Sequence, residues 1–210
     1  MELSADIELV RPERIARVRE ALSRRLGSVV AVCEAVLRRH NVSAILRSAE
    51  AFGVHEVQLV TGKFRPSPGA ARGAERWVLR RRFATIEESA ADLRSRGFRI
   101  WVADLADEAW TPDTLPLDAP AAIVFGSEVQ GVSAAARALA DGAVRVPMHG
   151  LTESLNVSVS AAILLRTVAE RQRARVGPDL DATAQERFVA DWLQAEEKAM
   201  RGVMARAAER

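Results

Sequence analysis

Short apolar segments alternate with helical patterns along most of this chain, and this alternation is the strongest constraint on its fold. The segment SVVAVC (28–33) is typical of a buried strand, NVSAILRSAEAFG (41–53) of a helix, and EVQLV (56–60) of a second strand. A strand–helix–strand unit predicts a parallel sheet, so we expect an α/β fold class.

The helix expected over 41–53 has two clear ends and one apolar side. Asn41 is a predicted N-cap, and Gly53 suits the position just after the last helical turn. Arg47 falls on the polar side. The apolar stripe repeats at three- and four-residue intervals and comprises Val42, Ile45, Ala49 and Phe52.

The rest of the chain continues the alternation. Further strands are expected over 77–80, 98–103, 121–125 and 143–147. Further helices are expected over 11–26, 86–96, 133–140, 154–173 and 182–208, with a long loop over 61–76. Residues 155–160 alternate apolar and polar as a strand would, but we interpret them as a loop that meets a helix. The predicted domains are a basic N-terminal helical extension (1–27), a central domain (28–175) and a C-terminal helical extension (176–210).

Composition excludes several classes of protein. The 210 residues suit one domain with terminal extensions. Cys33 is the only cysteine, so no internal disulfide can form, which fits a reducing cytoplasm. The apolar run AAILL ends at Arg166 and falls far short of the ~20 residues that a membrane span needs, so we expect no membrane partner and a cytoplasmic location.

Arginine dominates the basic residues. Of 30 basic side chains only Lys63 and Lys198 are lysine, and six arginines fall within each of the segments 11–25 and 65–82. A coding preference for arginine explains this composition as well as bidentate phosphate contact does. The clustering favours an acidic partner such as nucleic acid. The candidate RNA contacts are Arg11, Arg14, Arg17, Arg19, Arg80 and Arg81.

Several common sites are absent from the sequence. No G-x-G-x-x-G follows an expected strand, so a Rossmann dinucleotide site is unsupported. The segment GSEVQGVS (126–133) has the spacing of a P-loop, but Val132 stands where the phosphate-binding lysine is needed. His40, His55 and His149 are scattered, so no metal site is expected.

Three loops follow expected strands: VAD (102–104), FGSEVQG (125–131) and VPMHGLTESLN (146–156). In an open α/β sheet, ligands bind beyond the carboxyl ends of the strands. Glycines in these loops let the backbone approach a flat ligand. The loops therefore predict a cup for a small amphipathic molecule such as an adenosine derivative. Its apolar lining would include Val146, Met148 and Leu155.

Three segments resemble the three motifs of the SpoU-type methyltransferases of the SPOUT superfamily. They are NVSAILRSAEAFG, IVFGSEVQGVS and VPMHGLTESLNVSVSAAILL, in the family's order and spacing. The likeness is greatest to the tRNA guanosine 2′-O-methyltransferase branch, which also has a basic N-terminal helix and a DWL element, here Asp191–Leu193. It covers residues 11–195. The resemblance implies a parallel sheet with a C-terminal deep trefoil knot, flanked by N- and C-terminal helices.

The resemblance also implies a homodimer that binds S-adenosyl-L-methionine (AdoMet) as methyl donor, without a metal, and acts on tRNA. The residues that match the family's cofactor pocket are Ala103, Gly126, Ser127, Val146, Met148 and Leu155. The residues that match its functional polar positions are Arg47, Asn41, Glu128, Ser154 and Asn156. Capping alone would explain Asn41, and a turn position would explain Glu128.

The implied reaction is methylation of the ribose 2′-hydroxyl of guanosine 18 in the D-loop of tRNA. The family assigns the activation of that hydroxyl to the residue at Arg47. Because a guanidinium stays protonated, we expect Arg47 to orient the 2′-oxygen and stabilise its developing negative charge. The alternatives are 2′-O-methylation of another tRNA nucleotide or of rRNA, and a non-catalytic RNA-binding protein.

Overall fold

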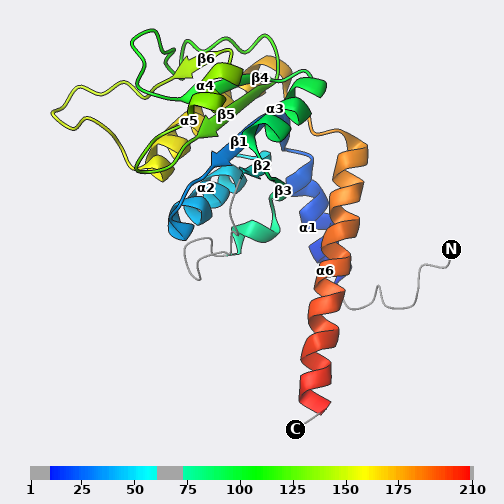
Figure 1. Cartoon of the computed structure of the whole chain (residues 1–210). Coiled ribbons are helices and arrows are strands. Elements are labelled where there is room, and N and C mark those ends of the chain that lie inside the picture. Colours follow the sequence, from blue (N-terminus) through cyan, green and yellow to red (C-terminus); the bar gives the residue numbers. More distant parts are fainter. Residues whose placement is uncertain (1–9, 61–72, 209–210) are drawn as a thin grey trace. The chain divides into compact units, whose positions relative to one another are not determined.

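The structure, a computed structural model, describes residues 10–60 and 73–208 (Figure 1). Most of the long loop expected over 61–76 lies outside these residues. The described chain divides into two compact units. One unit is Leu26–Asp179, and the other combines the residues before Leu26 with those from Leu180 onward.

The larger unit is built on a six-stranded sheet in the order β3-β2-β1-β5-β4-β6. Every neighbouring pair of strands in it is parallel, which confirms the predicted fold class. The strands are β1 (Leu26–Glu34), β2 (Val54–Val60), β3 (Leu79–Phe83), β4 (Arg99–Ala103), β5 (Ala121–Phe125) and β6 (Gly142–Val144).

Helices cover both faces of this sheet (Figure 1). Along β1, Ala31 and Cys33 belong to one apolar core with the helices over 39–51 and 157–176. Val30 and Val32 belong to a second core with the helices over 86–95 and 134–139. This explains why β1 is apolar at nearly every position, as parallel strands buried on both faces are. The helices are α2 (Arg39–Ala51), α3 (Ile86–Ser95), α4 (Ala134–Leu139) and α5 (Val157–Val176), with a short 3-10 helix η2 (Ala74–Arg76).

The start of α2 differs from the prediction. The helix begins at Arg39 with Arg38 as its N-cap, so the expectation that Asn41 caps it is wrong. Asn41 lies inside the first turn and is almost fully buried; its side chain donates to Glu128 and accepts from Asn156, and does not accept from N–H groups of its own helix. The predicted end is confirmed, since Gly53 follows the C-cap residue Phe52 with φ +75°.

The start of α5 also falls later than expected. The helix begins at Val157, and Asn156 is its N-cap, with Oδ1 accepting from the Ser158 N–H at 2.8 Å. The alternation over 155–160 therefore spans the end of a loop and the first helical turn, as we interpreted it. Farther along the helix, Leu164 and Leu165 are buried in the core. β6 is shorter than predicted and ends at Val144.

The smaller unit pairs α1 (Pro12–Leu22) with α6 (Ala182–Ala208), and these two helices contact each other. Val18 and Leu22 are buried on α1, and Val189 and Trp192 on α6. Both helical extensions thus bury apolar side chains. None of the helices in the described residues is long and apolar enough to cross a membrane. The trefoil knot stays a prediction.

Candidate active site

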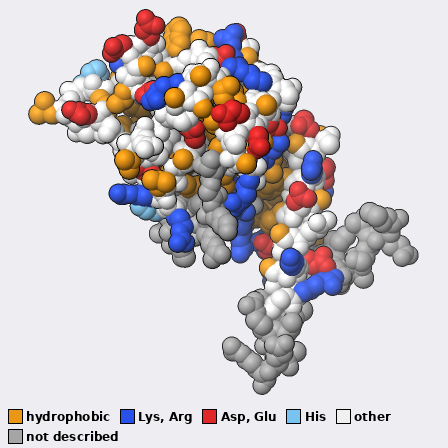
Figure 2. Space-filling view, viewed as in Figure 1, with side chains coloured by type: hydrophobic (Ala, Val, Ile, Leu, Met, Phe, Trp, Pro, Cys, Tyr) orange, Lys and Arg blue, Asp and Glu red, His pale blue; other side chains and the backbone are white. Residues whose placement is uncertain are grey.

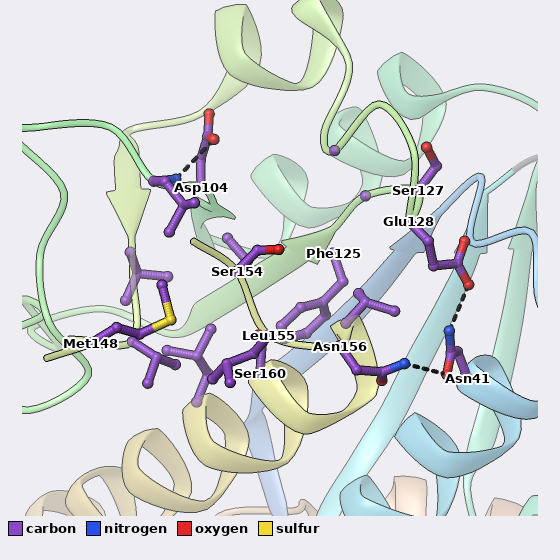
Figure 3. A pocket seen from close by; sticks show the side chains of 18 of the residues that line it. Asn41, Asp104, Phe125, Ser127, Glu128, Met148, Ser154, Leu155, Asn156 and Ser160 are labelled. Atoms are coloured by element: carbon purple, nitrogen blue, oxygen red, sulfur yellow. Dashed lines mark hydrogen bonds between the residues drawn. The ribbon is translucent and has the colours of Figure 1, made fainter. Parts of the chain in front are cut away.

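A cavity of about 460 Å³ opens at the carboxyl end of the sheet. The strands β4, β5 and β6 end at its wall with Ala103, Phe125 and Val144. The beginnings of α2 and α5 complete it (Figure 3). Its volume lies in the range of small-molecule sites. The residues predicted to bind the cofactor all line it, namely Ala103, Gly126, Ser127, Val146, Met148 and Leu155.

The loop after β5 is closed so tightly that one position admits only glycine. Ser127 and Gly131 exchange two backbone hydrogen bonds of 2.9 Å. A Cβ atom on Gly126 would lie 2.1 Å from the backbone carbon of Gly131. Gly131 itself has φ +67°, a conformation that glycine adopts without strain. These two glycines fix the loop that carries Ser127 and Glu128 to the cavity.

Three polar side chains from the three sequence motifs form one hydrogen-bonded chain. Asn156 Nδ2 donates to Asn41 Oδ1 at 3.2 Å. Asn41 Nδ2 donates in turn to Glu128 Oε1 at 2.7 Å (Figure 3). Because the carboxylate can only accept, it fixes the orientation of the Asn41 amide, which fixes that of Asn156. The polar end of the cavity is therefore pre-organised across α2, the β5 loop and α5.

Glu128 also anchors the start of α2. Its Oε2 accepts from the Leu37 N–H at 3.0 Å, and its Oε1 from the Arg38 N–H at 3.2 Å. Partial burial raises the pKa of the Glu128 carboxyl, but the hydrogen bonds from Asn41 and from backbone N–H groups outweigh burial and hold this pKa below its ordinary value. Glu128 is therefore an anion that organises the site and a weak base.

Apolar side chains form the opposite part of the wall. Phe125 is fully buried, and Leu155 is partly exposed at the cavity. Figure 3 shows Met148 at the end of the cavity away from Asn41 and Glu128. An apolar wall beside a polar one suits a ligand with a flat ring and a polar tail.

The remaining predicted polar residues are placed differently. Ser154 lines the cavity and is exposed. Arg47 is exposed on α2 and does not line the cavity. The structure therefore brings together four of the five predicted polar positions, Asn41, Glu128, Ser154 and Asn156, and leaves out Arg47.

Two charged residues of the wall escaped the sequence prediction. Asp104 follows β4 and accepts from Arg137 Nε at 2.6 Å and from the Leu105 N–H at 2.9 Å. Arg38 precedes α2 and is exposed. Asp104 lies in one of the three predicted loops, so its position at the end of a strand could have identified it as a cavity residue. For Arg38 the only signal was its closeness to Asn41 in the sequence.

The predicted RNA-contact arginines have unequal surroundings. Arg14 pairs with Glu196 at 3.1 Å and lies over the Trp192 ring at 5.3 Å. Arg19 makes two hydrogen bonds to Glu186. In the larger unit Arg81 pairs with Asp92 at 2.6 Å. On the face shown in Figure 2, basic side chains lie among acidic ones. Their contact with RNA stays a prediction, as it does for the exposed Arg11, Arg17 and Arg80.

A parallel α/β sheet with a nucleoside-sized, half-apolar cavity at its carboxyl end defines a class of nucleotide- and cofactor-binding proteins. Within that class, the model of the SpoU rRNA Methylase family matches residues 28–166. The chain belongs to this family of methyltransferases, which confirms the resemblance seen in its three motifs.

Relatives with assigned names support the same placement. The chain is 38% identical over 187 residues to the tRNA (guanosine(18)-2′-O)-methyltransferase of Thermus thermophilus, covering 86% of this chain and 96% of the relative. It is 39% identical over 168 residues to the protein of that name from Escherichia coli, covering 79% and 73%. The solved structure of the A. aeolicus TrmH/SpoU tRNA modifying enzyme matches with a TM-score of 0.80 and 29% identity, covering 88% of this chain and 96% of that one.

Proposed function

We propose that this protein transfers a methyl group from AdoMet to the ribose 2′-hydroxyl of guanosine 18 in tRNA. The observation that carries the proposal is the convergence of the three SpoU motifs on one cavity, in a chain whose similar relatives bear the name of that activity. We place this reaction in the cytoplasm as part of the proposal, since its substrate is tRNA.

The residues of the cavity fit AdoMet. Its adenine would lie against the apolar wall of Val146, Met148 and Leu155, and the backbone at Gly126 would border it closely. When bound, AdoMet supplies a methyl group activated by a positively charged sulfur. The protein's own residues would hold the methyl-bearing end of the ligand beside the polar wall, where Ser154 and Asn156 would contact the incoming ribose.

The hydrogen-bonded chain of Asn156, Asn41 and Glu128 would serve as a positioning device. Each amide is already oriented before a ligand arrives, so little ordering remains to be done when the ribose binds. The 2′-oxygen must lose its proton as the new bond to carbon forms. Because the pKa of Glu128 is held low, this carboxylate is better suited to orienting donors than to removing that proton.

A homodimer is part of the proposal. On α5, Val159 and Ile163 lie one turn apart and are 46% and 37% exposed. Leu151 is fully exposed in the loop that leads to this helix. We propose that a second copy covers these side chains, since exposed apolar groups on one helix face mark interaction surfaces. Because Asn156 begins the same helix, the second copy would lie next to the cavity.

The decisive experiment is methyl transfer from labelled AdoMet to an unmodified tRNA transcript, followed by mapping of the labelled nucleoside. We expect label on the ribose of guanosine 18 alone. Label on another tRNA nucleotide, or transfer to rRNA fragments only, would show that the protein methylates a different RNA substrate than the one proposed. Binding of tRNA and AdoMet without any transfer would instead identify a non-catalytic RNA-binding protein.

A further inference from the structure

We propose that Arg38 binds the RNA phosphate that is attached to the target nucleotide on the 3′ side of the reacting ribose. The proposal rests on the proposed function, and it adds a substrate contact that none of the sequence motifs indicated. Arg38 would be a substrate-binding residue of the cavity wall, acting on the RNA and not on the methyl donor.

The charged side chains of the cavity wall are Arg38, Asp104 and Glu128. Asp104 is paired with Arg137. The Glu128 carboxylate accepts three hydrogen bonds, one of which comes from the backbone N–H of Arg38 and none from its guanidinium. Among the residues that the structure describes, the Arg38 guanidinium has no hydrogen bond or ion pair. It is thus the charged group of the wall that remains available to a ligand.

An available guanidinium at a cavity selects an anion. Its planar set of N–H donors matches the oxygens of a phosphate or a carboxylate and retains its charge at any physiological pH. Elsewhere in this unit, arginines such as Arg94, Arg96 and Arg137 already have carboxylate partners at 2.6 to 2.8 Å. Within the described residues, exposed arginines such as Arg39 and Arg47 also have no ion pair, but they do not line the cavity. It is therefore the place of Arg38 in the cavity wall that points to a ligand.

The position of Arg38 favours the RNA phosphate as that anion. Its backbone is tied to Glu128, which in turn holds Asn41 and through it Asn156. Arg38 therefore belongs to the polar end of the cavity, where the ribose would enter. In RNA the 2′-hydroxyl is on C2′ and the 3′-phosphate is on the neighbouring C3′. A phosphate therefore lies close to the reacting oxygen wherever the ribose binds.

The test compares Arg38→Ala and Arg38→Lys with the control Arg39→Ala. Arg39 is the neighbouring arginine, equally exposed, but it does not line the cavity. Substitution of Arg38 removes only the side chain, so the N–H that Glu128 accepts is retained. Each variant is measured for affinity to unmodified tRNA, for KM and kcat of methyl transfer, and by calorimetry for AdoMet and S-adenosylhomocysteine.

We expect Arg38→Ala to weaken tRNA binding and raise KM about ten- to a hundredfold, the usual effect of losing a hydrogen bond to a charged group. Arg38→Lys should recover part of the loss, because it restores the charge without the bidentate geometry. Arg39→Ala should change tRNA affinity no more than about threefold, as a general phosphate contact does. Affinities for AdoMet and S-adenosylhomocysteine should stay within about twofold of the wild type.

A neutral methylphosphonate placed 3′ of guanosine 18 locates the contact. It should weaken binding to the wild type and to Arg39→Ala but have little further effect on Arg38→Ala, because the two changes remove the same interaction. Additive losses would overturn the proposal, as would equal losses for Arg38→Ala and Arg39→Ala. Weaker S-adenosylhomocysteine binding with unchanged 5′-methylthioadenosine binding would reassign Arg38 to the cofactor carboxylate. These binding measurements stand whether or not the wild type transfers a methyl group, so failure of the proposed function is recognised separately.

Discussion

The Asn41 amide donates to the Glu128 carboxylate at 2.7 Å, which joins residues 87 positions apart in the sequence and secures the first turn of α2 to the loop after β5. Replacing Glu128 by Gln removes the charge and one acceptor from a site that serves three donors. We expect the free energy of unfolding at pH 7 to fall by about 1–3 kcal/mol and AdoMet affinity to fall with it. Chemical denaturation and calorimetry measure the two effects.

The same substitution should change the response to acid. The folded-state pKa of Glu128 lies below its ordinary value of 4.5, so the folded protein binds fewer protons there than the unfolded chain. Its stabilising effect is present above pH 4.5 and is lost as the pH falls through the lowered pKa. The gap in stability between the wild type and Glu128→Gln should therefore narrow below that pH. Glu153→Gln, which removes a carboxyl from an exposed loop, is the matched control for the change in net charge.

Gly126→Ala should disrupt the cavity. The added methyl would lie within 2.2 Å of backbone atoms of Gly131 and Val132. Backbone atoms cannot move aside as the end of a flexible side chain could, so the clash remains. We expect a loss of about 1–3 kcal/mol in stability and at least tenfold in AdoMet affinity. Gly150→Ala is the matched control, because no atom lies within 4 Å of its added methyl. Equal behaviour of the two variants in thermal melts and calorimetry would show that the loop after β5 is not rigid.

Arg47 should act on the cavity of a second copy, since it does not line the cavity of its own chain. Arg47→Ala is expected to lower kcat at least a hundredfold while AdoMet still binds, as loss of a transition-state charge stabiliser does. Co-expression of Arg47→Ala with Gly126→Ala would place one intact site in each mixed dimer, giving roughly a quarter of wild-type activity. If the mixed dimers are inactive, Arg47 either acts on the cavity of its own chain or takes no part in the reaction.

The four exposed arginines of α1 and its N-cap should not contribute equally to tRNA affinity. Within the described residues, Arg11 and Arg17 have no ion pair, whereas Arg14 pairs with Glu196 and Arg19 with Glu186. We expect Arg17→Ala to reduce the slope of log affinity against log salt by about one. Arg14→Ala should reduce it less, because its charge is already partly compensated. A salt titration that shows the same slope for both variants would contradict this ordering.

Substitution of Ala35 by Asn should raise the free energy of unfolding. Ala35 has φ +49°, the left-handed region, which costs an alanine roughly 1–2 kcal/mol. Asn tolerates this conformation, so Ala35→Asn is expected to stabilise the protein by about 0.5–1 kcal/mol. Ala91→Gly, at an exposed position inside α3, should instead lose about 1 kcal/mol. A loss of stability with Ala35→Asn in denaturant titrations would mean that its surroundings reject the larger side chain.

Sequence reasoning found the strands and the three loops of the cavity because both follow from local patterns. Buried strands are recognised by their apolar runs, and the carboxyl ends of parallel strands meet at one edge, which placed Val146, Met148 and Leu155 together. The prediction that Asn41 caps the helix was wrong because a good N-cap residue can also bond to a distant partner. That partner, Glu128, cannot be found from periodicity, since no repeat relates the two positions.

The contact between the two terminal regions was also beyond local patterns. Two helical extensions at opposite ends of the sequence were expected, yet nothing in either one predicts that α1 and α6 contact each other. That contact depends on how the apolar faces of the two helices pair, and both helices carry buried apolar side chains, such as Leu22 and Trp192. The placement of Arg47 outside the cavity is a similar case, because the helical pattern shows that Arg47 lies on the polar side but not how far that side is from the cavity.

The wall of the cavity draws on residues from Arg38 to Leu164, and its hydrogen-bonded chain closes only when Asn156 joins Asn41. A ribosome synthesises the protein from its N-terminus, so α2 and the β5 loop emerge well before the residue that links them to α5. Until then the side-chain carbonyl of Asn41 lacks its hydrogen-bond donor, and the cavity lacks the part of its wall that α5 supplies. A complete cavity therefore depends on α5, and a prematurely terminated chain that stops before α5 would lack the wall residues from Val157 to Leu164.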